Sequence, residues 1–177
     1  MQSLRIISDD HSNMWRLATT IDQVAEEIEG GAKADQAFFN SVFDYIEQFV
    51  DRYHHPKEDE HLFRLLRLRS TQAAAILDPL QQEHRDGPQQ LKTLRACVVQ
   101  AARGELAAPE FVATLRAYTA GLKNHMRQEE KSVMPLAREV LTQQDWADID
   151  RAFLDNEDPL FGDKAKAEFR ELFHRIA

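Results

Sequence analysis

Two stretches of the sequence decide the fold, HHPKEDEHLF at residues 54–63 and HMRQEEKSVMP at residues 125–135. Each stretch holds a histidine that is followed four residues later by a glutamate, which gives the pairs His54–Glu58 and His125–Glu129. Residues four apart lie on one face of an α-helix, one turn from each other. Each pair can therefore direct an imidazole and a carboxylate at the same point in space.

Upstream of each pair lies a segment with helical periodicity and a lone histidine on its apolar face. His11 holds this place in the first half of the chain and His84 in the second half, at a similar distance before the pair. The chain therefore looks like two helical hairpins of one design. A pseudo-two-fold axis between the hairpins would gather four imidazoles and two carboxylates inside one bundle, from His11, His54, Glu58, His84, His125 and Glu129.

Glycine and proline residues divide the chain into long segments of good helix formers, and strand-forming runs of Val, Ile and Thr are scarce. Helices are expected over residues 6–28, 35–69, 78–103 and 109–141, the third with an interruption at Gly87–Pro88. Pro56 lies inside the second helix and should kink it or force a local bulge. Short connections make neighbouring helices antiparallel. We therefore expect an all-α, up-down four-helix bundle over residues 1–141.

Residues 142–177 form a different kind of segment. Thr142 and Asp145 have the spacing of a capping box ahead of a short helix, and a last amphipathic helix follows it. The segment is too short to form a hydrophobic core of its own. We expect a C-terminal helical extension that packs on the bundle as part of the same domain.

Composition excludes several classes of function. The net charge of −8 repels phosphate backbones, so nucleic acid is not an expected partner. The chain has no apolar run of the roughly 18 residues that a membrane-spanning helix needs, and its start, MQSLRIISDD, lacks the features of a signal peptide. Cys97 is the single cysteine, which fits a reducing compartment. We expect a soluble cytoplasmic protein without a membrane partner.

The two glutamates of the motifs point to metal chemistry. A buried carboxylate without a partner is costly, and two that face each other repel. A pair of divalent cations removes both problems. Imidazole and carboxylate ligands suit iron, manganese or zinc, and the absence of thiolate argues against copper(I) and iron–sulfur clusters. If both carboxylates bridge, each metal receives about four protein donors and keeps open positions for an oxo bridge, water or a gas.

The same six residues, in this order and in the contexts HPKEDEHLF and HMRQEEKSVMP, resemble the ligands of the hemerythrin-like HHE cation-binding proteins. The resemblance covers residues 1 to about 140. It implies a hemerythrin-like bundle that holds two iron ions, with or without an oxo bridge, through four histidines and two bridging glutamates. Ligand type alone also permits manganese or zinc.

The resemblance has a subtype. Oxygen-carrying hemerythrins have a His-x-x-x-His on the third helix and an aspartate on the fourth, whereas this chain has Pro88 four residues after His84 and a glutamate at position 129. The pattern is similar to that of the di-iron repair-of-iron-centres proteins, which act in nitrosative and oxidative stress, but their cysteine-containing N-terminal domain is absent. A stand-alone bacterial HHE protein is the closest description. These departures argue against simple reversible oxygen carriage and against a direct transfer of iron–sulfur repair.

Other polar residues near the motifs are expected to have smaller roles. His55 lies about 100° from His54 around an α-helix, so it should leave the face of the ligands. His61 either approaches that face or lies at the surface. Glu47 and Tyr118 each precede a motif histidine by seven residues and share its face one layer away. Tyr118 is the better core residue, and an inward Glu47 could hydrogen-bond a ligand or relay protons. The acids that flank the ligands are expected to be solvated, namely Glu60, Glu83 and Glu130.

Three classes of function fit these observations. The first is a redox-active di-iron protein that binds oxygen, binds or reduces nitric oxide, or decomposes peroxide. The second is a metal or gas sensor, or an iron-handling module, in which occupancy changes the stability of the bundle or a partner surface. The third is a structural bundle whose metal is incidental or missing. No glycine-rich phosphate loop, nicotinamide fingerprint or serine triad competes with them, and whether the protein is an enzyme stays open.

Overall fold

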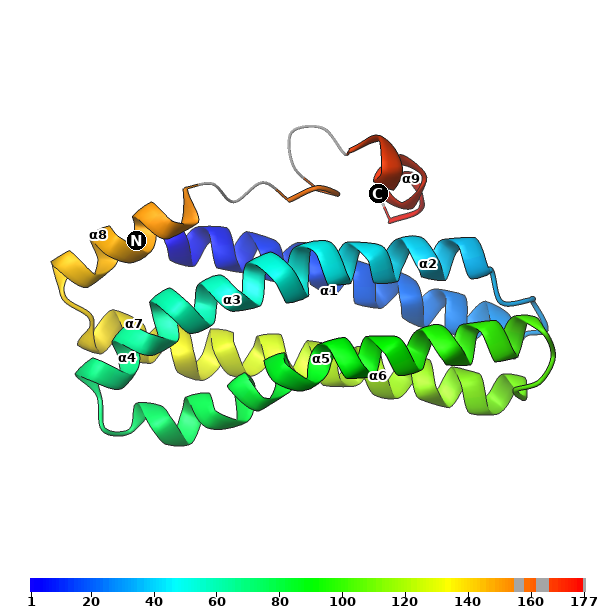
Figure 1. The fold of residues 1–177 in the computed structure, drawn as a ribbon, viewed down its shortest axis with the longest axis horizontal. Coiled ribbons are helices and arrows are strands. Elements are labelled where there is room, and N and C mark those ends of the chain that lie inside the picture. The colour runs from blue at the N-terminus through cyan, green and yellow to red at the C-terminus, as the bar shows by residue number, and fades with distance from the viewer. Residues whose placement is uncertain (155–157, 162–165, 177) are drawn as a thin grey trace.

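The computed structural model describes residues 1–154, 158–161 and 166–176, and every regular element within these residues is helical. The predicted all-α fold is confirmed. Long helical rods run side by side, and the C-terminal tail lies across one side of them (Figure 1). None of the helices in the described residues combines the length and the hydrophobicity needed to cross a membrane.

The bundle consists of rods that match the expected helices in number and order. The first rod is α1 (Gln2–Glu29), and the third is α5 (Ala73–Ala102). The second and fourth rods are continuous but change their helical type along their length. The second runs through α2 (Gln36–Tyr45), η1 (Ile46–His54), α3 (His55–Lys57), η2 (Glu58–Phe63) and α4 (Arg64–Arg69). The fourth runs through α6 (Ala108–Gln128), η3 (Glu129–Val133) and α7 (Met134–Val140).

Local signals in the sequence explain the boundaries of the first hairpin. Gly31 follows α1 with a φ of 101°, a left-handed conformation that favours glycine and reverses the chain. Asp35 then caps α2, since its side chain accepts a hydrogen bond from the Phe38 backbone N–H at 3.1 Å. These two signals place the first and second rods antiparallel.

Pro56 has the effect expected of it. The helix around it takes the π form over Ile46–His54 and Glu58–Phe63, where backbone N–H groups bond five residues back instead of four. Proline supplies no N–H to an α-helical ladder, and a wider turn accommodates that loss. The wider turn also rotates each residue by less than 100° from its neighbour, and this changes which side chains face the interior.

The third rod differs from the expected helix. It begins at Ala73 instead of Asp78, and it runs without a break through Gly87 and Pro88. Ala73 and Leu77 are fully buried, so packing stabilises helical turns ahead of Pro79, where the sequence predicted the helix to begin. Pro88 is exposed, and buried leucines on either side of it hold the rod together despite the missing N–H.

Two hydrophobic clusters fill the bundle, one toward each end. The larger contains Met14, Leu17, Phe39, Phe43 and Phe111 among others. The smaller contains residues of all four rods and of the tail, among them Ile7, Phe63, Leu77, Val133 and Ile149. The buried polar side chains of the motifs lie between these clusters. Apolar packing on both sides therefore fixes the position of a polar layer that contributes little hydrophobic stabilisation itself.

The tail packs on the bundle through specific contacts. The predicted capping box is confirmed, with Thr142 Oγ1 accepting from the Asp145 backbone N–H at 3.2 Å ahead of α8 (Gln143–Phe153). Asp150 accepts hydrogen bonds from the Ser3 backbone and hydroxyl at 2.8 and 2.6 Å, which joins α8 to the start of α1. The short η4 (Ala167–Phe169) leads into α9 (Arg170–Ile176), whose Arg175 pairs with Asp35.

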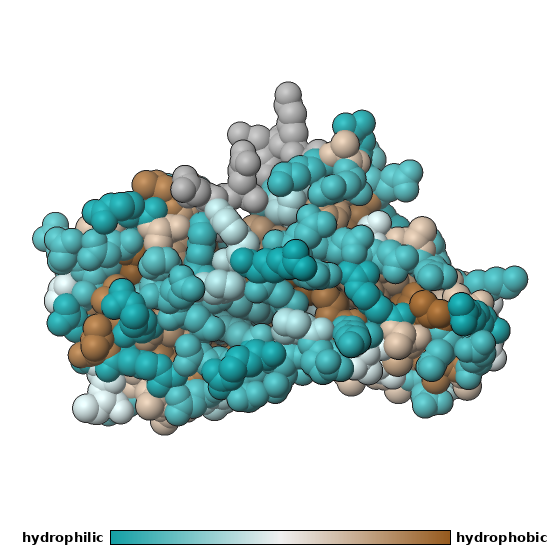
Figure 2. Space-filling model, in the orientation of Figure 1, coloured by the Kyte–Doolittle hydropathy of each residue, from teal (hydrophilic) through white to brown (hydrophobic). Residues whose placement is uncertain are grey.

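Few large hydrophobic side chains are exposed in the part of the chain that the structure describes. The face shown in Figure 2 is mostly hydrophilic, with hydrophobic residues in small separate areas. Among the described residues, the large hydrophobic side chains that are exposed are Met1, Leu68 and Leu154, which are too few for a large apolar patch. The polar side chains of the two motifs, by contrast, are buried inside the bundle.

Candidate metal centre

The six residues predicted from the motifs converge in the interior of the bundle. All are at most 8% exposed: His11, His54, Glu58, His84, His125 and Glu129. The first rod contributes His11 and the third contributes His84, while the second and fourth each contribute a histidine and a glutamate. The structure therefore brings together every residue of the predicted set, with one hairpin facing the other.

Each glutamate lies within reach of histidines from both hairpins. Glu129 has one oxygen 3.1 Å from His11 Nε2 and the other 3.4 Å from His125 Nε2. Glu58 has one oxygen 3.5 Å from His54 Nε2 and the other 3.9 Å from His84 Nε2. A carboxylate whose two oxygens face different histidines has the arrangement required of a bridge between two cations.

The donor atoms fall into overlapping groups that could each hold a cation. In each group the possible ligand atoms lie within 4.8 Å of one another: His11, His54 and Glu58; Glu58, His84 and Glu129; and His55, His84 and His125. Glu58 belongs to two groups and His84 to two, so the groups form one continuous cluster. Their spacing is compatible with two neighbouring cations that share carboxylates.

A carboxylate holds the outer nitrogen of each of the four predicted histidines. The Nδ1–H groups donate to acids of a neighbouring rod at 2.7 to 3.1 Å, in the pairs His11–Glu130, His54–Asp10, His84–Asp59 and His125–Glu83. Each of these acids is the sequence neighbour of a predicted ligand on its own rod. The pseudo-two-fold relation of the hairpins extends to them, because Asp10 and Glu83 each precede a histidine and Asp59 and Glu130 each follow a glutamate.

These outer hydrogen bonds determine which nitrogen faces the interior. With the proton on Nδ1, the Nε2 atom of each imidazole carries a free lone pair. His84 Nε2 and His125 Nε2 lie only 3.0 Å apart, so two lone pairs would point at each other unless a proton or a metal cation lies between them. Two nitrogens at right angles on one cation, each at a usual bond length of about 2.1 Å, would lie about 3.0 Å apart.

Unpaired polar atoms provide a second test of the site. Buried atoms without a hydrogen-bond partner include His11 Nε2, His54 Nε2, Glu58 Oε2 and both carboxylate oxygens of Glu129. Buried polar atoms are rarely left without a partner, since each costs about 1–3 kcal/mol. All five of these atoms point to one place and are of the types that bind iron, manganese or zinc. The residues present therefore fit a pair of metal cations.

The electrostatics of the site favour positive charge. Burial and the charge of Glu129 raise the pKa of Glu58 well above its usual range. Burial lowers the pKa of His11 and His125, but the neighbouring carboxylates outweigh it and raise these pKa values to about 9 and about 10. The acids therefore draw protons or metal cations toward the inner nitrogens.

His55 was expected to leave the face of the ligands, and this prediction is wrong. Its ring stacks on His84 with centroids 4.0 Å apart, and its side chain is only 12% exposed. The expectation assumed the 100° step of an α-helix, whereas His55 directly follows the π-helical segment η1, in which the step is smaller. The smaller step adds up along η1, so His54 faces Asp10 of the first rod and His55 faces His84 of the third, and both rings lie in the interior.

Three of the remaining expectations for acids are also corrected. Glu47 faces outward, with 41% of its side chain exposed, and pairs with Arg52 and Arg95, so it does not approach a ligand. Glu83 and Glu130 are partly exposed as expected, but their carboxylates hold His125 and His11 and are not simply solvated. In the sequence, the signal for them was an acid directly beside each predicted ligand.

The structure also shows where Glu60, Tyr118 and His61 lie. Glu60 is exposed. Tyr118 packs against the larger hydrophobic cluster, as a core residue should. His61 is half-buried and belongs to none of the groups of possible ligand atoms found in the described residues.

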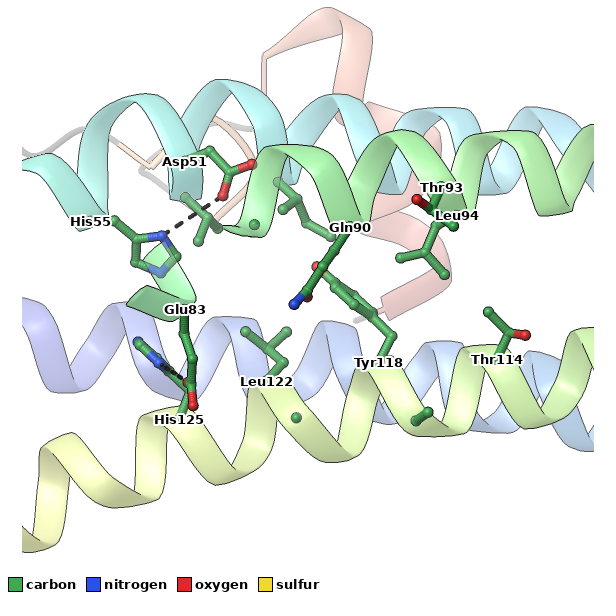
Figure 3. A pocket seen from close by; sticks show the side chains of 15 residues that line it. Asp51, His55, Glu83, Gln90, Thr93, Leu94, Thr114, Tyr118, Leu122 and His125 are labelled. Carbon is green, nitrogen blue, oxygen red and sulfur yellow. Dashed lines mark hydrogen bonds and ion pairs between the residues drawn. The ribbon is translucent and has the colours of Figure 1, made fainter. Parts of the chain in front are cut away.

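A cavity of about 470 Å³ approaches the cluster from one side (Figure 3). Its inner end is formed by Asp51, His55, Glu83 and His125, and its walls are formed by side chains of η1, α5 and α6. Leu94, Tyr118 and Leu122 lie along it in Figure 3. The wall also includes exposed positions of α6, so the cavity connects the cluster with the surface. This cavity was not predicted from the sequence.

Comparison with known proteins agrees with the geometry. No curated protein and no solved structure matches the chain significantly. A family model described as the hemerythrin HHE cation binding domain matches residues 2–137, a range that includes all six predicted ligands and ends close to the end of α7. The match covers most of the chain. The chain therefore belongs to the hemerythrin HHE cation-binding domain family.

Proposed function

We propose that this protein holds two iron ions between its hairpins and uses them to bind or reduce a small molecule, either a diatomic such as oxygen or nitric oxide, or a peroxide. The observation that supports this most strongly is the set of buried, unpaired inner atoms of His11, His54, Glu58 and Glu129. A purely structural bundle gains nothing from such atoms, whereas a metal centre requires them. Cation binding follows from the family, and the number and identity of the ions are part of the proposal.

In this proposal each residue has a definite task. Glu58 and Glu129 contact histidines of both hairpins and would bridge the ions, while His11 and His54 would cap one side and His84 and His125 the other. The outer carboxylates keep each Nε2 lone pair directed inward. Bound iron would supply the one-electron chemistry that none of these side chains can perform.

The cavity supports a small uncharged reactant. Its walls contain Val50, Leu94 and Leu122, where an ion would lose hydration and a neutral diatomic would lose little, and polar side chains such as Gln90 that could hydrogen-bond a peroxide. The cavity ends beside His55 and His125, which places an entering molecule next to the cluster. No nucleic acid, membrane or other large partner is needed, and a cytoplasmic location belongs to this proposal.

Metal analysis of protein produced in iron-rich medium tests the proposal. We expect close to two iron atoms per chain and a visible absorption band, both lost in Glu129→Ala and kept in the exposed control Glu60→Ala. Adding oxygen, nitric oxide and hydrogen peroxide separately to the reduced protein then separates reversible binding from turnover. A colourless protein that contains no iron and melts as well as an iron-treated sample would refute the proposal.

Sensing is a second candidate because the tail contacts the rods that carry the ligands. Asp158 accepts a hydrogen bond from the Tyr45 hydroxyl at 3.0 Å on the second rod and lies 3.4 Å from the Asn13 amide on the first, two residues from His11. Occupancy of the centre could therefore alter the docking of the tail. Limited proteolysis of the tail with and without iron tests this candidate, and equal cleavage rates would exclude it.

A further inference from the structure

We propose that His55 is a fifth histidine ligand, which gives one cation three imidazoles and the other cation two. The inference rests on the proposed function, since it requires that the cluster holds cations. His55 supplies one of the three donors in the group His55, His84 and His125, whose possible ligand atoms lie within 4.8 Å of one another. That group contains no carboxylate, and one of its three imidazoles lies outside the six predicted ligands.

The three rings are arranged as imidazoles that share a cation. The centroid of His55 lies 4.0 Å from that of His84 and 5.4 Å from that of His125, while His84 and His125 are 4.8 Å apart. A ring bound through nitrogen at about 2.1 Å has its centroid about 3 Å from the cation, so rings at right angles lie about 4–5 Å apart. Simple stacking of His55 on His84 would explain the first distance but not the convergence of all three rings.

His55 also faces a carboxylate, that of Asp51, but at a longer distance than the other four histidines. His55 Nδ1 faces Asp51 Oδ1 at 3.7 Å, which directs the other side of the ring toward Glu83 and His125 (Figure 3). Asp51 is four residues before His55 and buried, with 6% of its side chain exposed. A Cβ on Gly87 would lie 3.2 Å from Asp51 Oδ1, so the glycine leaves room for this carboxylate. The pair is longer than a hydrogen bond, and metal binding would draw the ring into place.

The second hairpin has no counterpart of this arrangement. The residue after His125 is Met126, which is buried in the larger hydrophobic cluster, and the residue three before His125 is Leu122, where the first hairpin has Asp51. Both the donor and its carboxylate are therefore found in only one of two otherwise matching motifs. The duplication places four histidines symmetrically, and His55 makes the two sides unequal.

Replacement of His55 by phenylalanine tests the inference. His55→Phe keeps a flat ring stacked on His84 and removes the nitrogen, and His61→Phe serves as a matched control outside the cluster. We expect the iron-loaded wild type to show two different iron environments in its Mössbauer spectrum. We expect His55→Phe to lose one iron at least about ten-fold faster to a chelator, because a ligand contributes at least as much affinity as the groups that orient it. An unchanged spectrum and unchanged iron retention would overturn the inference.

A measurement on the unaltered protein covers the case in which the variant does not fold. In the cobalt(II)-loaded wild type, each bound imidazole gives one strongly shifted, exchangeable N–H signal in the proton NMR spectrum. Five such signals support the role of His55, and four overturn it while leaving the proposed function intact. If the wild type binds no metal at all, the proposed function fails together with the inference, so the two failures are distinct.

Discussion

Replacing Glu58 by glutamine should stabilise the metal-free protein and destabilise the iron-loaded protein, each relative to the wild type. Glu58 is 1% exposed, and its Oε2 atom has no hydrogen-bond partner. The acceptors within its reach are His54 Nε2, His84 Nε2 and the oxygens of Glu129. The amide of Glu58→Gln has nearly the same shape as the acid but carries two N–H donors and no charge.

In metal-free protein the variant should therefore be more stable than the wild type. Relief of one unpaired buried oxygen amounts to about 1–3 kcal/mol of unfolding free energy, and for a domain of this size that corresponds to a rise in Tm of roughly 2–12 °C. In iron-loaded protein the order should reverse. Iron at a hundred times its Kd stabilises the wild type by about 2.7 kcal/mol for each ion, and Glu58→Gln loses most of this because an amide is a poor bridge.

Differential scanning calorimetry of both proteins, with iron added under anaerobic conditions or removed by a chelator, measures the reversal. Glu60→Gln is the matched control, because it makes the same chemical change at an exposed position of the same π-helical segment, and it should leave both Tm values unchanged. A Glu58→Gln variant that is less stable than the wild type both with and without iron would refute the reasoning. In that case Glu58 would act as a structural acid with a partner in the protein.

Three further predictions follow from other parts of the structure. Gly121→Leu should fold normally, because a Cβ added at Gly121 meets no atom within 4 Å, but its side chain should fill the mouth of the cavity. The variant should therefore react more slowly with tert-butyl hydroperoxide in stopped-flow experiments. Ala120→Leu, at an exposed position beside it, should react at the rate of the wild type. Glu83→Gln should weaken iron binding about 10- to 100-fold in chelator competition, because the His125 ring loses its anchor. Arg69 holds the pKa of Asp145 well below its ordinary value, so the stability that this pair contributes is present at neutral pH and is lost as the pH falls below about 4. Thermal melts in acid should show this as a fall in Tm, and the fall should be smaller in Asp145→Asn.

The residues that converge in the interior could be predicted from the sequence because their signal depends on one short spacing. A histidine and a glutamate four residues apart share a face whatever the rest of the helix does, within a small error. The order of the two hairpins then required only that the connections be short. Neither step depends on where a helix begins, and so the wrong start of the third rod, at Ala73 instead of Asp78, did not affect the site.

His55 could not be placed in the same way because its direction depends on the type of helix. The smaller step of a π-helix adds up along η1, and it turns His54 toward Asp10 of the first rod and His55 toward His84 of the third. Pro56 was the available sign that the helix would change, since its ring removes a donor from the ladder. The sequence indicated a bulge or a kink, but it did not indicate which side chains the bulge would turn inward.

The outer carboxylates illustrate a different limit. An acid beside each ligand is visible in the sequence, but acids are common on exposed helix faces and carry little information alone. Glu83 and Glu130 gain their role only because a histidine of the next rod comes within hydrogen-bonding distance. The sequence left the position of Glu47 open, and it lies outward because Arg95 of the neighbouring rod pairs with it. Contacts between rods decide both outcomes, and these depend on tertiary packing.

The cavity opens on the side of the centre where His55 lies, and His55 forms part of its lining. A duplicated hairpin gives matching ligands to both cations, and a symmetric bundle would give both the same access to solvent. Here the lining of the cavity comes from η1, α3, α5 and α6 and includes no residue of α1, so the cavity approaches the His84–His125 side. The smaller cluster, the tail and α1 enclose the His11–His54 side. If His55 binds the cation on the approached side, an entering molecule meets the cation that already has three imidazoles and fewer free positions. Release of His55 would then be the simplest way to open a position there, and the long 3.7 Å contact with Asp51 is the weak point at which the ring is free to turn.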